Sequence, residues 1–190
     1  MSLDHIILGA LEEPRSGYEL KRWFDEVFAF FWNADQSQIY RSLNRLSDEG
    51  LLSVRAEASP IGPGRRVYRT TAKGRAEFRR WLREGPASPA QKSAIYAQLL
   101  FLPRVPAAEA MRFLVEFKAQ SDQLAAALAQ IPDDPAQDPD DDHAARAAFF
   151  NRASLSLGRA RAQATQEFAA ALLEDYRKQF PGETDDGHTA

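Results

Sequence analysis

The sequence predicts a mainly α-helical protein with one small β hairpin, divided into two domains. In residues 37–46, Ile39, Leu43 and Leu46 recur at i, i+4 and i+7, the spacing of one face of an α-helix. Residues 52–57 alternate and residues 65–70 are β-prone, and the segment 60–64 between them holds two prolines and two glycines, which favour a turn. From residue 90 onward the pattern is helical and contains no strand candidate.

Three helices are expected before the hairpin. Residues 3–12 suit a short buried helix that ends in a turn over residues 13–17, and residues 18–32 predict a second helix that is unusually aromatic. Asp35 is placed to cap the third helix, with Gln38 three residues later in the reciprocal position of a capping box. Gly50 is expected to end this helix in a left-handed conformation.

The hairpin should follow at once. Leu52, Val54 and Ala56 alternate with polar residues, as in a half-buried strand, and the return strand runs over residues 65–70. Thr71 can then cap a fourth helix. Helices followed by a hairpin with a basic tip make a winged helix-turn-helix domain, which we assign to residues 1–84.

The second half of the chain predicts an all-α domain at residues 85–180, followed by a polar tail at 181–190. Its linker is the Gly-Pro-Ala-Ser-Pro segment 85–89, and helices are expected at 90–102, 107–130 and 143–180. The last helix carries a seam at spacings of three and four, rich in small residues: Phe150, Ala153, Leu157, Ala160, Ala164, Phe168 and Ala171. We interpret this seam as a dimerisation element; packing within the same subunit is the alternative.

Charge is unevenly distributed along the chain. The formal net charge is −3, yet residues 1–84 hold fourteen Lys and Arg against twelve Asp and Glu. Between residues 65 and 83 there are eight basic residues and one acidic residue, a local positive field suited to a polyanion, although a solvated helix face is the simpler explanation. There are no cysteines, no run of apolar residues long enough to span a membrane and no leader-like start, so we expect a cytoplasmic protein without disulfides.

The third helix has the side chains of a DNA-recognition helix. Opposite its apolar stripe it presents hydroxyl, amide and guanidinium groups, which bind base edges and phosphates, on Ser37, Gln38, Arg41, Asn44 and Arg45. Tyr40 lies beside this face and either binds a phosphate or packs locally. Further candidates are Tyr18 and Lys21 for phosphates, and Arg65 and Arg66 for the minor groove or its phosphates at the wing. The alternative for the whole face is an ordinary exposed polar surface.

An aromatic cluster occupies residues 23–32. At helical spacing such side chains usually form core, but this stretch holds more aromatics than one helix face can bury. The excess could contact the second domain, another subunit or a small hydrophobic effector, and we name Trp23, Phe28, Phe31 and Trp32 as a possible effector pocket.

Several kinds of site are not expected. The acidic run at residues 138–142 lacks the glycine and the terminal glutamate of a calcium loop, and the three histidines lie far apart, so we expect no metal site and no cofactor. No nucleophile, base and orienting group occur together, so an enzyme is not expected.

Over about 75 residues the chain resembles the PadR family of bacterial transcriptional regulators. The motifs that carry the resemblance are Ile7-Leu8-Gly9-Ala10-Leu11, Ser16-Gly17-Tyr18-Glu19-Leu20, residues 39–46, Asp48-Glu49-Gly50-Leu51-Leu52, residues 66–70 and Thr71-Ala72-Lys73-Gly74-Arg75. The second half resembles the helical extension of the subgroup related to virulence-gene activators. The resemblance implies a homodimer that binds a pseudo-palindromic operator in double-stranded DNA. Members of this family are often repressors, and in some of them a phenolic or other hydrophobic small molecule relieves the repression.

We therefore predict a DNA-binding transcriptional regulator without a membrane partner. A different class, a winged-helix module that binds protein and not DNA, has mild support from the acidic second domain. A steep loss of duplex affinity with rising salt would favour the regulator, because each neutralised phosphate releases counterions.

Overall fold

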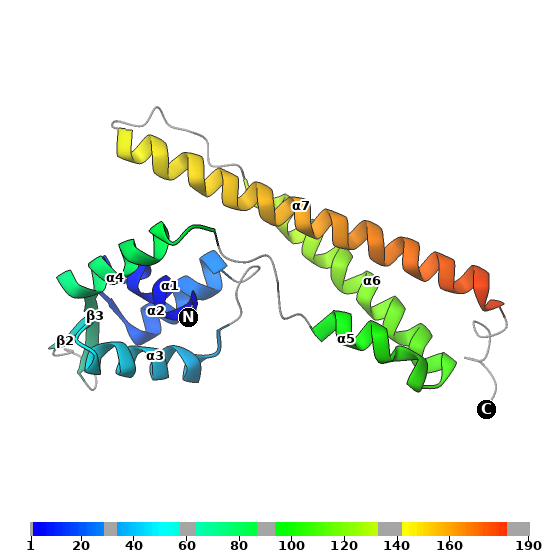
Figure 1. Ribbon diagram of the computed structural model, residues 1–190, viewed down its shortest axis with the longest axis horizontal. Helices are drawn as coiled ribbons and strands as arrows, with labels where there is room; N and C mark the ends of the chain where they lie inside the picture. The colour runs from blue at the N-terminus through cyan, green and yellow to red at the C-terminus, as the bar shows by residue number, and fades with distance from the viewer. Residues whose placement is uncertain (1, 29–33, 58–63, 87–93, 133–141, 182–190) are drawn as a thin grey trace. The chain divides into compact units, whose positions relative to one another are not determined.

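The computed structural model describes residues 2–28, 34–57, 64–86, 94–132 and 142–181 (Figure 1). The chain forms two compact units, Met1–Ala90 and Gln91–Ala190. Some expected segments fall wholly or mainly outside the described residues: most of the linker, the tip of the wing, the acidic loop and the polar tail beyond Pro181.

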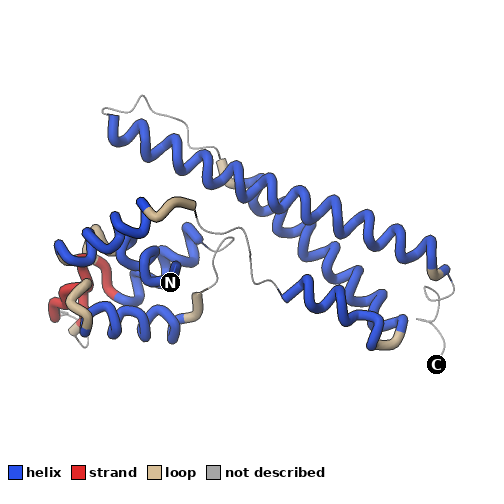
Figure 2. Tube along the Cα trace, viewed as in Figure 1, coloured by secondary structure: helices blue, strands red, loops and turns tan. Residues whose placement is uncertain are grey.

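The first unit is a helical domain with a small sheet, shown by element type in Figure 2. Its elements are α1 (Ser2–Ala10), β1 (Arg15–Ser16), α2 (Gly17–Trp23), the π-helical turn η1 (Phe24–Phe28), α3 (Gln36–Asp48), β2 (Leu52–Glu57), β3 (Arg65–Thr70) and α4 (Ala72–Arg83). The predicted fold class, mainly α with a small β component, is confirmed.

Side-chain caps set where the helices begin. Asp35 and Gln38 form the predicted capping box of α3, with the Gln38 backbone N–H donating to Asp35 Oδ1 over 2.7 Å. Thr71 caps α4 as predicted, accepting from the Gly74 N–H over 3.1 Å. Ser16 and Glu19 form a second capping box at α2 that was not predicted. Gly50 has φ of 71°, the left-handed conformation expected after α3.

The sheet has three strands, in the order β1-β3-β2, and not the two of the expected hairpin. Arg15 pairs with Tyr68 and Ser16 with Val67, so the segment predicted as a simple turn also adds a third strand to the sheet. A two-residue strand has no periodicity to detect, and only the partner strand defines it.

The strand β2 also differs from the expected half-buried strand. Leu52 is buried, but Val54 is 44% exposed and Ala56 is exposed. Strand β2 lies at the edge of the sheet and pairs only with β3, from Leu52 opposite Thr70 to Glu57 opposite Arg65. The hairpin therefore leaves the core after its first residues, as a wing does.

The core of the first unit lies between α1, α2, α3 and the sheet. The apolar face predicted for α3 is confirmed: Ile39 and Leu43 are 0% exposed and Leu46 is 2% exposed. They belong to one buried cluster with Ile7, Leu11, Leu20 and Phe24. Burying such side chains stabilises the fold by about 1.5–3 kcal/mol each, which holds α3 in one orientation.

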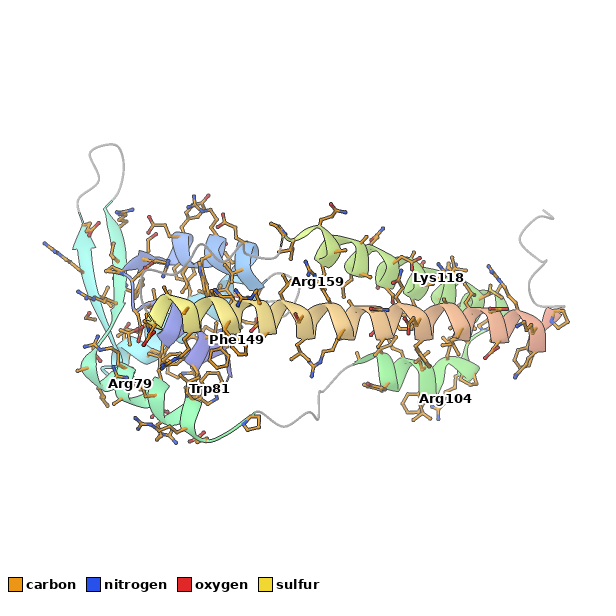
Figure 3. All side chains as sticks on the ribbon, turned by 90° about the horizontal axis from the view of Figure 1, so that it is seen from above. Arg79, Trp81, Arg104, Lys118, Phe149 and Arg159 are labelled. Atoms are coloured by element: carbon orange, nitrogen blue, oxygen red, sulfur yellow. The ribbon has the colours of Figure 1, made fainter. Side chains whose placement is uncertain are left out.

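The second unit contains α5 (Ala94–Phe101), the 3-10 turn η2 (Leu102–Arg104), α6 (Ala107–Gln130) and α7 (Asp142–Gln179). Helices α6 and α7 pack side by side, as Figure 1 shows, and Ala162, Ala169 and Leu173 are buried on α7. Arg159, labelled in Figure 3, donates to the Leu128 carbonyl over 3.1 Å. This hydrogen bond satisfies one of the carbonyl groups in the last turn of α6 that have no partner within the helix. In the described parts of the chain, no helix is long and apolar enough to cross a membrane.

Candidate nucleic-acid interface

Helix α3 presents one polar, exposed face. Ser37, Gln38, Arg41, Asn44 and Arg45, the residues predicted to face the major groove, are all exposed, while Ile39, Leu43 and Leu46 are buried on the other side. The capping box and the buried stripe together fix the rotation of the helix about its axis. The fold thus leaves this face open to a ligand.

The five side chains differ in the contacts they already make. Ser37 Oγ donates to Asp35 over 2.6 Å, and the Gln38 carboxamide accepts from the Asp35 N–H over 3.2 Å, so both take part in the cap. The hydrogen bond from Ser37, followed by that from the Gln38 N–H, holds the pKa of Asp35 below its usual value. Arg45 pairs with Asp4 on α1.

Arg41 and Asn44 are the two members of the face best placed for base contacts. Within the described residues, neither side chain makes a hydrogen bond or ion pair to the protein. Arg can bind guanine and Asn can bind adenine through two parallel hydrogen bonds each. Their donors and acceptors can therefore meet a duplex without first breaking a protein contact.

Tyr40 packs against the first residue of α2. A Cβ atom built on Gly17 would lie 2.7 Å from the Tyr40 ring and hydroxyl, so glycine is required for this close contact. Local packing, one of the two roles left open for Tyr40, is therefore present, although the side chain is still 36% exposed. Tyr18, the next residue after Gly17, is 70% exposed and can reach a phosphate.

The other predicted phosphate contact on α2 is already engaged. Lys21 forms an ion pair with Asp25, and its side chain is 28% exposed. Contact with a phosphate would require this ammonium group to exchange one anion for another. Such exposed pairs are worth about 0–1 kcal/mol, so the exchange is accessible.

The two arginines at the start of β3 are not equivalent. Arg65 donates from Nη1 to Glu19 on α2 over 3.0 Å and from Nε to Glu57 on β2 over 3.1 Å. Arg66 is exposed, and the structure shows no ion pair for it among the described residues. Arg65 thus positions the wing, and Arg66 is the better placed of the two for contact with DNA. The wing tip, residues 58–63, lies outside the described residues.

Glu19 is a site residue that the sequence analysis missed. Its carboxylate accepts from the Ser16 N–H over 2.7 Å and from Arg65. The hydrogen bonds from Ser16, more than the charge of Arg65, hold the pKa of Glu19 below its usual value. The Ser-x-x-Glu pattern at residues 16–19 signalled the cap, but nothing local signalled the arginine 46 positions later.

The positive field of residues 65–83 is partly neutralised within the domain. On α4, Arg80 pairs with both Glu77 and Glu84, while Arg75 donates to the Thr70 carbonyl and Lys73 to the Glu49 carbonyl. Arg69, Arg79 and Arg83 remain exposed. Figure 3 labels Arg79 on this helix.

The possible effector pocket falls largely outside what the structure describes. Phe31 and Trp32 lie in the segment 29–33, and the side chain of Phe28 is likewise not described. Trp23 is half-buried, packs on the core and contacts Phe24 edge-on, with ring centroids 5.5 Å apart. Whether these four residues form a pocket stays a prediction.

The second unit contains an apolar groove of about 500 Å³. It lies where α5 and η2 meet the start of α6 and the end of α7. Its lining is Leu99, Leu102, Pro103, Val105, Ala107, Ala110, Leu114, Phe168, Leu172, Tyr176 and Phe180. The sequence analysis did not anticipate this groove, because its lining combines two stretches that are far apart in the chain, residues 99–114 and 168–180.

The predicted dimerisation seam on α7 is exposed. Phe150, Leu157 and Phe168 are 60%, 57% and 51% exposed, and Ala160, Ala164 and Ala171 are exposed as well. The buried residues of α7 are a different set, Gly158, Ala162, Ala169 and Leu173. The seam is thus separate from the face that packs on α6. The described residues contain no cluster of His, Asp and Glu suited to a metal ion.

Comparison with known proteins gives consistent matches. Residues 7–80 match the model of the transcriptional regulator PadR-like family. A probable transcriptional regulator of Mycobacterium tuberculosis, Rv1176c, is 38% identical over 98 residues, which is 50% of this chain and 52% of that protein. The negative transcriptional regulator PadR of Bacillus subtilis is 36% identical over 81 residues, 42% of this chain and 44% of that protein. The chain thus spans about half the length of these curated relatives.

Solved structures match over nearly the whole chain. The crystal structure of Bacillus subtilis PadR in complex with operator DNA aligns with a TM-score of 0.68 and 23% identity, covering 93% of this chain and 99% of that chain. The Vibrio cholerae virulence activator AphA aligns with the same TM-score, identity and coverage. At such identities these matches establish the fold, including the helical second half. Both curated relatives are named as regulators and not as enzymes, as predicted.

Proposed function

We propose that this protein, which belongs to the PadR-like transcriptional regulator family through residues 7–80, represses transcription by binding a pseudo-palindromic operator as a homodimer. The observation that carries the proposal is the divided surface of α3, with its buried stripe on one side and Arg41 and Asn44 exposed on the other. The negative role named for the Bacillus subtilis relative, and its crystal structure with operator DNA, support it.

In this proposal α3 enters the major groove with its first two turns. Ser37, Gln38, Arg41 and Asn44 face the base edges, while Tyr18 and Lys21 on α2 bind phosphates and set the register on the duplex. Asp48 and Glu49 at the end of α3 are exposed and repel phosphates, so the helix enters by its N-terminal half. Arg66 extends from the wing toward the adjacent minor groove.

A homodimer follows from the size of the binding surface. One short recognition helix contacts only a few base pairs, and two copies related by a two-fold axis double the site and make it palindromic. The two α3 helices would then lie about 34 Å apart, one turn of B-DNA. The exposed seam on α7 supplies an apolar surface for the contact.

A small hydrophobic effector is the proposed regulatory ligand. The support is a crystal structure of Bacillus subtilis PadR in complex with p-coumaric acid. Trp23, Phe28, Phe31 and Trp32 remain the proposed pocket, and calorimetric titration with p-coumaric acid as the probe tests it. Binding by the wild type that is lost in Trp23→Ala would support this location, and unchanged binding in the variant would contradict it. As a DNA-binding regulator the protein would act in the cytoplasm.

The experiment that tests the function is selection of bound duplexes from a random pool, followed by titration of the selected duplex at several salt concentrations. We expect an inverted-repeat consensus, and an affinity that falls steeply with salt because phosphate contacts release counterions. A protein-interaction module would select no consensus and would show no such dependence.

A further inference from the structure

Arg45, on the polar face of α3, pairs with a residue of another helix. Its side chain is 42% exposed, and its Nη2 donates to Oδ1 of Asp4 on α1, 41 positions earlier in the chain. Within the described residues the structure shows no further hydrogen bond or ion pair for this guanidinium group. An arginine carries several N–H donors, so those on Nη1 and Nε stay available to a ligand.

Asp4 presents its carboxylate from a rigid position. Its side chain is 14% exposed, and it lies in the first turn of α1, where the positive end of the helix dipole favours an anion. Helix α1 is anchored by Ile7, which is 0% exposed and shares a buried cluster with Ile39 and Leu43 of α3. Core packing therefore fixes where this carboxylate stands relative to α3.

The pair on α2 is built differently. Lys21 pairs with Asp25 four residues later, and the Asp25 side chain is 60% exposed. Both partners come from one short stretch of chain and can exchange with ions of the solvent at little cost. An anion held in place restricts the rotamers of its cation, whereas an exposed anion moves with it. Arg45 is thus held in one orientation, and Lys21 is not.

Arg45 lies one turn behind Arg41 on nearly the same side of α3. Four residues advance an α-helix by about 6 Å and turn it by about 400°, which is only about 40° more than a full turn. A recognition helix reads base edges with its N-terminal residues. Arg45 is therefore farther from the base edges than Arg41, at the depth of the sugar-phosphate backbone.

An arginine that is already oriented binds a phosphate at a lower entropic cost than a freely rotating one. Hydrogen bonds between guanidinium and phosphate are directional, because the donors lie in one rigid plane. When α3 is fully docked on its preferred site, each phosphate has one position relative to the bases. A fixed arginine then contributes most to that complex and less to complexes in other registers.

We propose that Asp4 is a positioning residue for DNA recognition, which holds Arg45 as a pre-oriented phosphate contact one turn behind Arg41. The inference rests on the operator binding proposed above and extends it to a residue of α1. Asp4 does not touch DNA in this arrangement. Its effect should appear in the specificity ratio, defined as the affinity for the selected duplex divided by the affinity for a random duplex.

Asp4→Asn tests the positioning role, because it keeps the shape of the side chain and removes its charge. The specificity ratio should fall about fivefold, since the released Arg45 side chain can follow a phosphate in any register of the duplex. A merely structural defect would reduce the folded fraction, lower both affinities equally and leave the ratio unchanged. An unchanged ratio would therefore overturn the proposal.

Asp25→Asn is the matched control, because it also removes the acidic partner of a proposed phosphate-binding cation. Loss of one anion near DNA should raise the affinities for both duplexes by a similar factor. The specificity ratio should stay within about twofold of the wild-type value. A fall as large as that of Asp4→Asn would show that lost charge alone changes the ratio, and the role of Asp4 would be refuted.

A double-variant cycle tests whether Asp4 acts through Arg45. Arg45→Gln should lower the specificity ratio about as much as Asp4→Asn, and the double variant should lower it no further, since both changes remove one and the same contact. Arg45→Gln should also reduce the slope of log affinity against log salt by about 1, the value for one phosphate. Losses that multiply in the double variant, or a relaxed preference at a single base position in Arg45→Gln, would contradict the assignment.

The same measurements separate this inference from the proposed function. A wild type that selects a consensus, together with an Asp4→Asn variant of unchanged specificity ratio, overturns the role of Asp4 and leaves the function standing. A wild type that selects no consensus overturns both. The expected result is a consensus, a ratio that falls in Asp4→Asn and a ratio that is kept in Asp25→Asn.

Discussion

Arg65 at the first position of β3 donates to Glu19 on α2 over 3.0 Å, which ties the base of the wing to the helix that precedes α3. The same carboxylate accepts the Ser16 N–H in the cap of α2. One acidic side chain therefore positions both the start of α2 and the base of the wing. Two parts of the candidate interface are held in a fixed relation by a pair that is 46 residues apart.

Glu19→Gln should loosen the wing. Loss of the anionic cap and of the pair with Arg65 is expected to lower the free energy of unfolding by about 0.5–1 kcal/mol. It should also speed amide hydrogen exchange at the base of β3, measured by mass spectrometry. Glu13→Gln removes another carboxylate paired with an arginine, but one whose side chain is 81% exposed, and should change neither quantity. Equal effects of both substitutions would contradict the positioning role of Glu19.

Glu77 should make the first unit sensitive to acid. Its hydrogen bonds, from Arg80 first and then from His5, lower its pKa to about 2 from an ordinary value of 4.5. Because the pKa is lower in the folded state, the stabilisation is complete above pH 4.5 and is lost as the pH falls from 4.5 toward 2. Thermal unfolding followed across this range should show a shallower pH dependence for Glu77→Gln than for the wild type. The same pH dependence in both proteins would show that the Glu77 carboxylate does not contribute to the acid sensitivity.

Arg41→Ala and Lys21→Ala should weaken DNA binding in different ways. Removing Arg41 is expected to lower affinity for the selected duplex by roughly 1–3 kcal/mol and to relax preference at one base position. Removing Lys21 should weaken selected and random duplexes about equally and reduce the salt dependence. Arg79→Ala, an exposed arginine on α4 outside the proposed contacts, is the control for nonspecific charge. The same loss for the first two variants on both duplexes would exclude the assigned roles.

Gly74→Ala should destabilise the first unit more than Gly50→Ala. A Cβ atom at Gly74 would lie 2.2 Å from the Leu51 carbonyl oxygen, which belongs to the backbone and cannot move aside. We therefore expect the free energy of unfolding to fall by about 3 kcal/mol. At Gly50 nothing lies within 4 Å of the added atom, and only the left-handed φ of 71° opposes alanine, by about 1–2 kcal/mol. Chemical denaturation of both variants checks the order, and the reverse order would contradict it.

The local sequence determined the helices, their caps and the polar face of α3. The stripe of Ile39, Leu43 and Leu46, the box of Asp35 and Gln38 and the stop at Gly50 depend on interactions within a few residues, and periodicity and capping chemistry report such interactions directly. The seam on α7 was likewise identified from spacing alone, whereas its exposure comes from the structure.

Tertiary structure alone decided the rest. Strand β1 exists because β3 lies beside it, Val54 is exposed because its strand leaves the core, and Arg65 positions the wing because folding brings Glu19 to it. The groove in the second unit likewise needs two stretches that are far apart in the chain, residues 99–114 and 168–180. Contacts between distant residues carry no local signature, since their geometry is set by packing that only the complete domain creates.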